Sequence, residues 1–202
     1  MLAMSKWSGR AVAVLATGPS LTAEDCEAVR DADVITVGVN SAWKMAPWID
    51  VLYAGDTRYW KHNHEDIEAA GCTAKRYSRN VTAERKYQAK RVKSALGADY
   101  NSGEMAVEMA IRFGSPFVIM LGFDVSVDAG IHFHGQHKNT SNPDARRCNR
   151  WLTQFARIPK KYPKAVVVNC SRKTALSCFP RMDLESAIAR IPEFTAHGSR
   201  AA

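Results

Sequence analysis

The sequence predicts a three-layer α/β fold, with a Rossmann-like, mainly parallel sheet and helices on both of its faces. Short apolar runs alternate along the chain with segments of helical periodicity, an order that is typical of strands joined by right-handed crossovers. Small polar clusters rich in Gly, Ser, Asn and Asp follow the apolar runs, where strands would end. The chain has 202 residues, 46% of them hydrophobic, which fits one domain spanning residues 1–202.

The N-terminal part of the chain predicts a strand, a glycine turn and a helix. Residues 11–16 are all apolar, as expected of a strand buried on both faces of a parallel sheet. The turn that follows contains Gly18 and Pro19. Thr22 can act as the N-cap of the next helix, because Asp25 completes a variant of the capping box.

The middle of the chain predicts two more strands and two helices. Residues 33–39 and 50–54 have the composition of strands, and polar residues follow each of them. A short helix is predicted over 64–70, with Gly71 as its C-cap. A longer helix is predicted to begin at Ser102, which would cap it. Its apolar side chains fall on one face, and Gly114 closes it: Met105, Ala106, Met109, Ala110 and Phe113.

The C-terminal part completes the alternation. Residues 116–121 predict another buried strand. Asn142-Pro143 opens a helix that Pro159 stops. Residues 165–169 predict the last strand, and residues 184–191 predict the last helix.

Residues 75–97 interrupt this order and predict a basic insertion in the domain. Between positions 75 and 93, Glu84 is the only acidic residue. We expect this segment to be a mobile excursion from the sheet. Its basic residues are Lys75, Arg76, Arg79, Arg85, Lys86, Lys90, Arg91 and Lys93.

Composition excludes several classes of protein. No stretch approaches the ~18 to 20 consecutive apolar residues that span a bilayer, and residues 1–10 lack an apolar signal core; we therefore expect a soluble, cytoplasmic protein. The five cysteines include no C-x-x-C pair, which disfavours a disulfide framework or a thiolate zinc site. The formal net charge of +8 favours contact with anions such as nucleotides, phosphorylated substrates, nucleic acid or acidic glycans.

The polar clusters at the predicted strand ends are the main functional signal. In open parallel sheets, ligands bind at the carboxyl ends of the strands, where helix N-termini attract anions. Each cluster alone would be an ordinary turn, so their convergence is what indicates a site. The clusters are Thr17-Gly18-Pro19-Ser20, Asn40-Ser41, Gly55-Asp56, Asn101-Ser102-Gly103 and Gly122-Phe123-Asp124.

Each cluster has a structural and a functional interpretation. Gly18 lets the backbone approach a ligand and Ser20 can bind phosphate, or both belong to a tight turn. Asn40 can bind a base edge or a ribose hydroxyl, or cap a helix. Asp56 can hold a ribose, a metal or an acceptor hydroxyl, whereas Ser102 can bind phosphate or only cap its helix. No G-K-[ST] or G-x-G-x-x-G motif occurs, which disfavours a P-loop kinase or ATPase.

The richest polar cluster is the run H-F-H-G-Q-H at residues 132–137. His132 and His134 alternate and His137 lies a short turn away, so all three histidines can reach one centre. Imidazole suits general-base catalysis near neutral pH. Three histidines and a water would also make a catalytic zinc site, although the spacing matches no standard zinc signature. A structural role is the third interpretation.

The basic segment at 75–93 also contains Tyr77 and Tyr87. Cations combined with aromatic rings are typical of surfaces that bind nucleic acid, and a solvated basic loop is the alternative. Arg146, Arg147 and Arg150 can extend this surface or clamp a phosphate from a helix.

Taken in chain order, these motifs resemble two related protein groups. One is the bacterial sialyltransferase family that uses CMP-sialic acid, and the other is the archaeal-type 6-hydroxymethylpterin diphosphokinase-like family. Short proteins of bacteriophages and prophages carry similar sequence, including the H-x-H-G-x-H run and Asn169-Cys170-Ser171. The motifs that carry the resemblance are L-A-T-G-P-S-L at 15–21, V-N at 39–40, G-D at 55–56, N-S-G at 101–103 and L-G-F-D at 121–124.

The resemblance to the sialyltransferases implies a nucleotide site and a histidine base. The base would be His132, His134 or His137, and no metal would be required. Related transferases often form tetramers, so a homo-oligomer is expected. The nucleotide would be bound by Gly18, Pro19, Ser20, Asn40, Ser102, Gly103 and Gly122. Thr17, Asp56 and Asn101 lie in the same clusters and join the expected binding site, and Asp124 joins the expected catalytic group.

Three functional hypotheses follow, of which we expect the first. The first is a metal-independent glycosyltransferase that uses a nucleotide-activated sugar, such as a CMP-linked one, with a histidine as general base. The second is a diphosphotransferase on the same fold, in which Asp56 and Asp124 hold Mg²⁺ against the phosphates of ATP. The third is a phage-encoded protein without enzymatic activity that binds nucleic acid through the basic segment.

Overall fold

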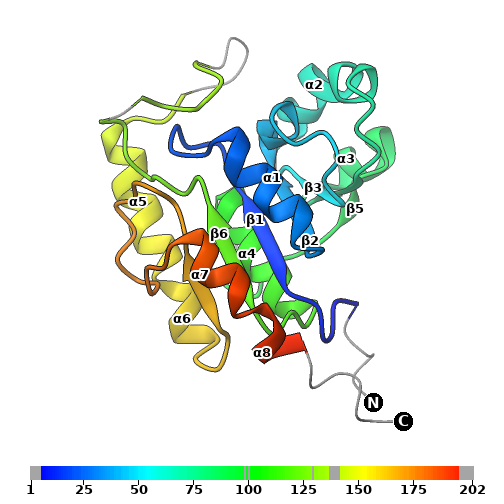
Figure 1. Ribbon diagram of the computed structural model, residues 1–202. Coiled ribbons are helices and arrows are strands. Elements are labelled where there is room, and N and C mark those ends of the chain that lie inside the picture. Colours follow the sequence, from blue (N-terminus) through cyan, green and yellow to red (C-terminus); the bar gives the residue numbers. More distant parts are fainter. Residues whose placement is uncertain (1–5, 98, 100, 129, 137–141, 196–202) are drawn as a thin grey trace.

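The described part of the chain forms a sheet of seven parallel strands in the order β5-β4-β3-β2-β1-β6-β7 (Figure 1). The computed structural model describes residues 6–97, 99, 101–128, 130–136 and 142–195. This all-parallel sheet, with helices packed against it, confirms the predicted fold class. The strands are β1 (Val12–Leu15), β2 (Ile35–Val39), β3 (Val51–Tyr53), β4 (Lys75–Ser78), β5 (Lys90–Arg91), β6 (Val118–Leu121) and β7 (Val167–Asn169).

Helices cover both faces of the sheet, because successive side chains of a strand point to opposite sides. Ala13 and Leu15 of β1 belong to one hydrophobic core, together with residues of α1, α2 and α7. Val12 and Val14 belong to a second core, together with residues of α4, α5 and α6. The helices are α1 (Ala23–Asp31), α2 (Thr57–Ala69), α3 (Val81–Tyr87), α4 (Ser102–Arg112), α5 (Ala145–Phe155), α6 (Arg157–Lys161), α7 (Leu184–Ala189) and α8 (Ile191–Thr195), with a 3₁₀ turn η1 (Asn40–Lys44).

The chain changes direction across the sheet at β1. This strand pairs in parallel with β2 on one side and with β6 on the other. Strands β2 to β5 extend the sheet from the first side, and β6 and β7 extend it from the second. At such a point the loops that leave the two neighbouring strands diverge to opposite faces and open a crevice at their carboxyl ends.

The structure corrects the expectation that residues 75–97 are an insertion and a mobile excursion. This segment contributes β4, α3 and β5, which extend the sheet beyond β3. The segment packs against the rest of the domain through a few small or apolar side chains. The buried ones are Tyr77, Ser78, Ala83, Ala89 and Val92. The charged side chains between them hid this pattern in the sequence.

Two helix boundaries also differ from expectation. Helix α2 begins at Thr57 rather than at residue 64. Pro159 does not stop the helix that precedes it, because α5 already ends at Phe155 and Pro159 lies in the first turn of α6. Proline is tolerated there, since the first-turn N–H groups have no partner within the helix. Among the described residues, none of the helices is both long and apolar enough to cross a bilayer.

Candidate functional site

A pocket of about 400 Å³ lies at the carboxyl ends of the strands, beside the crevice between β1 and β6. Residues that follow β1, β2, β3, β4 and β6 line it, together with the start of α4 and one side of α5. The pocket therefore collects segments that are far apart in the sequence. The residues expected from the sequence that line it are Thr17, Gly18, Asn40, Asp56, Asn101, Ser102, Gly103, Gly122, Asp124 and His132.

Three other expected residues are placed differently. Pro19, Ser20 and His134 are not among the residues that line the pocket. Ser20 instead lies behind it, where it holds Asp124. His137 lies outside the described residues.

Asp124 fastens the loop after β1 to the loop after β6. Its carboxylate accepts hydrogen bonds from the Ser20 backbone N–H (3.0 Å) and from the Ser20 hydroxyl (2.6 Å). The residue is only 4% exposed, and burial raises the pKa of this carboxyl group above its usual value, while the Ser20 hydrogen bonds lower it. These contacts make Asp124 a positioning residue for the turn at 17–20.

Gly18 is required by the packing inside the site. A Cβ atom at this position would lie 2.0 Å from Asp124 Oδ1 and 2.4 Å from the Gly122 carbonyl oxygen. Both distances are far below contact distance, so a side chain at position 18 would displace Asp124. Protein atoms therefore take up the space on the side of Gly18 where a Cβ would lie. Gly18 also lines the pocket, and its contact with a ligand stays a prediction.

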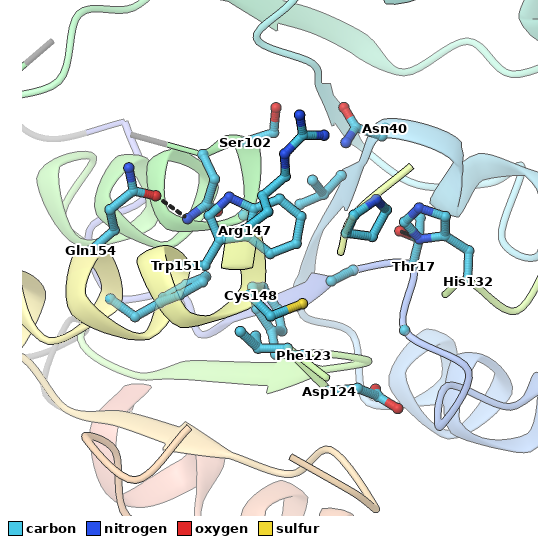
Figure 2. A pocket seen from close by; sticks show the side chains of 18 of the residues that line it. Thr17, Asn40, Ser102, Phe123, Asp124, His132, Arg147, Cys148, Trp151 and Gln154 are labelled. Atoms are coloured by element: carbon cyan, nitrogen blue, oxygen red, sulfur yellow. Dashed lines mark hydrogen bonds between the residues drawn. The ribbon is translucent and has the colours of Figure 1, made fainter. Parts of the chain in front are cut away.

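His132 is held at the end of β1. Its Nδ1 atom lies 2.9 Å from Thr17 Oγ1, and the Phe133 N–H donates to the Thr17 carbonyl oxygen at 3.0 Å. His134 stacks on His132 with ring centroids 5.0 Å apart and planes inclined by 16°. Figure 2 shows His132 and Thr17 together at one end of the pocket.

Asn40 presents its side chain to the pocket from an unusual backbone conformation. Its φ of 49° lies in the left-handed region, which residues other than glycine rarely adopt and which clusters at functional sites. Within the described part of the chain, the Asn40 amide makes no hydrogen bond. The amide is therefore available to a ligand in the centre of the pocket (Figure 2).

The start of α4 corrects the expected helix cap. Asn101, rather than Ser102, is the N-cap, and its Oδ1 atom accepts from the Glu104 N–H at 2.8 Å. Asn101 takes this role because its backbone is extended (φ −97°, ψ 164°), whereas Ser102 is already helical. The Ser102 hydroxyl instead accepts from the Gly55 N–H at 3.2 Å, so its own hydrogen can be donated into the pocket.

Arginines from two separate elements line the pocket. Arg79 follows β4, and Arg147 and Arg150 come from α5. Arg79 Nη2 lies 3.8 Å from Asp56 Oδ1, and Arg147 extends toward Ser102 and Asn40 in Figure 2. Guanidinium groups in this arrangement suit a phosphate or carboxylate ligand.

Helix α5 also supplies pocket residues that the sequence patterns did not identify as functional. Trp151, Gln154 and Phe155 line the pocket from this helix. The strong amphipathic pattern of α5 indicated a buried face, but nothing in the pattern distinguished contacts with the core from contacts with a cavity. Cys148 lines the pocket as well, and burial raises the pKa of its thiol, which keeps it protonated and poorly nucleophilic at neutral pH.

A buried network beneath the pocket fixes α4 to α6. Glu104 has no exposed surface and accepts hydrogen bonds from Arg157 at 2.9 and 3.1 Å. Arg157 also donates to the carbonyl oxygens of Leu96 and Asp99. Glu108, equally buried, accepts from the Tyr162 hydroxyl at 2.8 Å. These contacts hold the segment before α4 against α6, and with it one wall of the pocket.

No group of three or more His, Cys, Asp or Glu side chains with the geometry of a metal site occurs in the described ranges. Comparison of the chain with protein-family models, with curated proteins and with solved structures found no match. The interpretation of the site therefore depends on its own residues.

Proposed function

We propose that this protein binds a nucleotide-activated sugar in the pocket and transfers the sugar to a hydroxyl acceptor, without a bound metal ion. The observation that carries the proposal is the convergence of the ends of β1, β2, β3 and β6 with the start of α4 around one pocket. Crevices at the carboxyl ends of parallel strands are where open α/β sheets bind nucleotides. The volume of about 400 Å³ also lies within the range of ~300–1,000 Å³ found for small-molecule sites.

The charges around the pocket support an anionic ligand. Arg79, Arg147 and Arg150 line it, and the net charge of the chain is +8. Three acidic residues also belong to the lining, Asp56, Asp99 and Asp124. Asp124 is directed toward Ser20 and Asp56 toward Arg79. Arg147 and Arg150 add positive charge to the lining from α5, which favours the phosphates of a donor substrate.

The order of groups along the pocket supports a particular orientation of the donor. Gln154 and Trp151 lie at one end, Ser102, Arg147 and Asn40 in the middle, and Thr17 and His132 at the other end (Figure 2). In the proposed complex the nucleobase lies beside Trp151, the phosphates lie against Ser102 and Arg147, and the sugar lies next to His132.

In the proposed reaction, His132 takes the proton of the acceptor hydroxyl. When Nδ1 carries a hydrogen and donates it to Thr17 Oγ1, Nε2 is the basic nitrogen. The acceptor oxygen then forms a bond to the anomeric carbon, and the bond from that carbon to the phosphate oxygen breaks. The nucleotide leaves with the electron pair, and the arginines stabilise its charge. The Nε2 atom is buried, so the acceptor hydroxyl must enter the pocket to reach it.

A magnesium-dependent diphosphotransferase, the second hypothesis, gains less support from the contacts. Asp124 would have to release both hydrogen bonds from Ser20 before it could bind Mg²⁺. Those same bonds fix the turn at 17–20, so such a release would loosen the pocket itself.

Nucleotide binding should depend on the Asn40 amide. We expect Asn40→Gly to weaken the binding of CMP, UDP or their sugar conjugates by at least about tenfold, because a hydrogen bond to a charged or polar ligand is lost. Glycine accepts positive φ without strain, so this variant removes the side chain and keeps the turn. Isothermal titration calorimetry, after a thermal-shift screen of nucleotides with and without Mg²⁺, measures the change. Wild-type affinity in the Gly variant would contradict the role of Asn40.

A nucleic acid is a second candidate ligand, because the basic segment forms the end of the sheet that adjoins the pocket. The Val92 N–H bonds to the Ser78 carbonyl oxygen, which places Arg91 and Lys93 beside Arg79 at the carboxyl edge. Arg91 and Lys93 are exposed. These cations can contact phosphates of a strand that passes the mouth of the pocket.

If nucleic acid binds here, its affinity should fall steeply with salt. We expect charge reversal at Arg91 and Lys93 together to weaken binding of a single-stranded oligonucleotide and to reduce the slope of log affinity against log salt by about 1 to 2. Fluorescence anisotropy at several salt concentrations measures both quantities. The same reversal at Lys160 and Lys161 of α6 is the matched control. Equal losses from both pairs would indicate only a general charge effect.

A further inference from the structure

The loop that follows β7, residues 170–176, holds a pocket residue although it does not line the pocket itself. Ser171 Oγ accepts a hydrogen bond from the Phe123 N–H at 2.8 Å. Thr174 Oγ1 donates a hydrogen bond to the Phe123 carbonyl oxygen at 2.6 Å. Both polar groups of the Phe123 backbone are therefore bound by side chains that lie outside the pocket.

The direction of these bonds is set by Asn169, which has no exposed surface. Its Oδ1 atom accepts from the Ser171 N–H at 3.0 Å, and its Nδ2 group donates to Thr174 Oγ1 at 3.2 Å. The Leu176 N–H also donates to Thr174 Oγ1, at 3.1 Å. Because two donors already face this oxygen, the one hydroxyl hydrogen must be given to the Phe123 carbonyl oxygen.

The segment after β6 needs such support because its backbone is strained. Phe123 and Asp124 lie between Gly122, with a φ of 70°, and Val125, with a φ of 50°. A positive φ is unfavourable for a β-branched residue, and it persists only where the surrounding structure over-determines it. The Ala175 N–H adds a third bond from the loop, to the Asp124 carbonyl oxygen at 2.8 Å.

Two walls of the pocket depend on the position of this segment. The Phe123 ring packs against the start of α4, where a Cβ atom on Gly103 would lie 3.0 Å from Phe123 Cε1. The same ring meets Phe155 of α5 edge to face, with centroids 5.6 Å apart. The carboxylate of Asp124 holds Ser20 and with it the turn that follows β1. A shift of the segment would therefore move both walls together.

We propose that Ser171 and Thr174 are positioning residues of the pocket, which hold Phe123 and Asp124 in the conformation that forms these two walls. Neither side chain lines the pocket, so both act through the segment after β6. This inference deepens the proposed function, and the part of its test that measures nucleotide binding rests on that function.

Removal of the Thr174 hydroxyl tests the effect on binding. Thr174→Val keeps the branched shape but leaves the Phe123 carbonyl oxygen without its donor. We expect the affinity for CMP or UDP, whichever the wild type binds more tightly in calorimetry, to fall about tenfold. Thr174→Ser keeps the hydroxyl and should stay within about threefold of the wild type. Thr153→Val is the matched control, because this exposed hydroxyl bonds only within α5, and it should leave the affinity unchanged.

Amide hydrogen exchange tests the positioning role without any ligand. In Thr174→Val, we expect the amides of Phe123 and Ser20 to exchange at least about tenfold faster than in the wild type, because the segment opens locally. The amide of Val12 in the central strand β1 should be unaffected. Ser171→Ala removes the acceptor of the Phe123 N–H and gives the same readout should Thr174→Val fail to fold.

These measurements separate positioning from a general loss of stability. Equal acceleration at Val12 would overturn the proposal, as would unchanged exchange at Ser20. Equal nucleotide affinities for Thr174→Val and Thr153→Val would overturn it as well. If the wild type binds neither CMP nor UDP, the proposed function fails, whereas exchange at Phe123 and Ser20 still decides whether the loop after β7 holds them.

Discussion

Replacement of His132 by alanine should lower the rate of sugar transfer by about a hundredfold to ten-thousandfold, the usual contribution of a general base. Binding of the nucleotide should change much less, because the residue lies at the opposite end of the pocket from Gln154 and Trp151. Single-turnover measurement of transfer with the donor identified by the binding screen, alongside calorimetry of the nucleotide product, separates the two effects.

Two matched variants sharpen this prediction. His134→Ala removes the ring that stacks on His132 but takes away no residue of the pocket lining, so we expect a loss of no more than about tenfold. Thr17→Val removes the hydroxyl that contacts Nδ1 and keeps the branched shape. We expect it to lower the rate, because the hydroxyl favours the imidazole tautomer in which Nε2 is the basic nitrogen. A larger loss in His134→Ala than in His132→Ala would contradict the assignment of His132 as the general base.

Replacement of Arg157 by methionine should destabilise the fold by up to about 3–5 kcal/mol, the loss expected when a buried charge loses its partner, because Glu104 is fully buried while the Arg157 side chain is 32% exposed. Glu104 has no exposed surface, and Arg157 supplies its charged hydrogen bonds. Without them, the carboxylate must be buried uncompensated or become protonated. The variant also loses the contacts to the Leu96 and Asp99 carbonyl oxygens. Urea unfolding monitored by circular dichroism measures the change.

Arg146→Met is the matched control for this measurement, because Arg146 is an exposed arginine on α5. We expect that control to change the stability by less than about 0.5 kcal/mol. The double variant Arg157→Met with Glu104→Met should recover part of the loss, since no uncompensated charge is then left inside. A loss below about 1 kcal/mol in the single Arg157 variant would mean that the network contributes little to the fold.

Local sequence patterns were sufficient to predict the order of the main elements. Apolar runs identified β1, β2, β3, β6 and β7. Strands that are buried on both faces are apolar at nearly every position, so they stand out in the sequence as continuous apolar runs. The capping box of α1 was also recognised correctly, with Thr22 accepting from the Asp25 N–H. Strands β4 and β5 were missed, because their exposed positions carry most of the charge of the segment and only a few neighbours are buried.

For the candidate site, the sequence was sufficient to predict the polar residues that lie where the strands end. Asn40, Ser102 and Asp124 meet around one pocket because parallel strands of a single sheet all end at the same edge. The partners of these residues could not be predicted. Asp124 binds Ser20 across 104 residues of sequence, and Asn101 binds Gln154 across 53.

The sequence by itself determined the fold class and the edge of the sheet that gathers the polar clusters, because hydrophobic periodicity and glycine turns act over short distances. Only the tertiary structure decided what each cluster does there. It showed that Gly18 makes room for Asp124, that Asn101 rather than Ser102 caps α4, and that α5 contributes Trp151 and Gln154 to the pocket. These roles depend on which side chains from distant segments come into contact, and contact over long sequence separations is set by the packing of the whole domain.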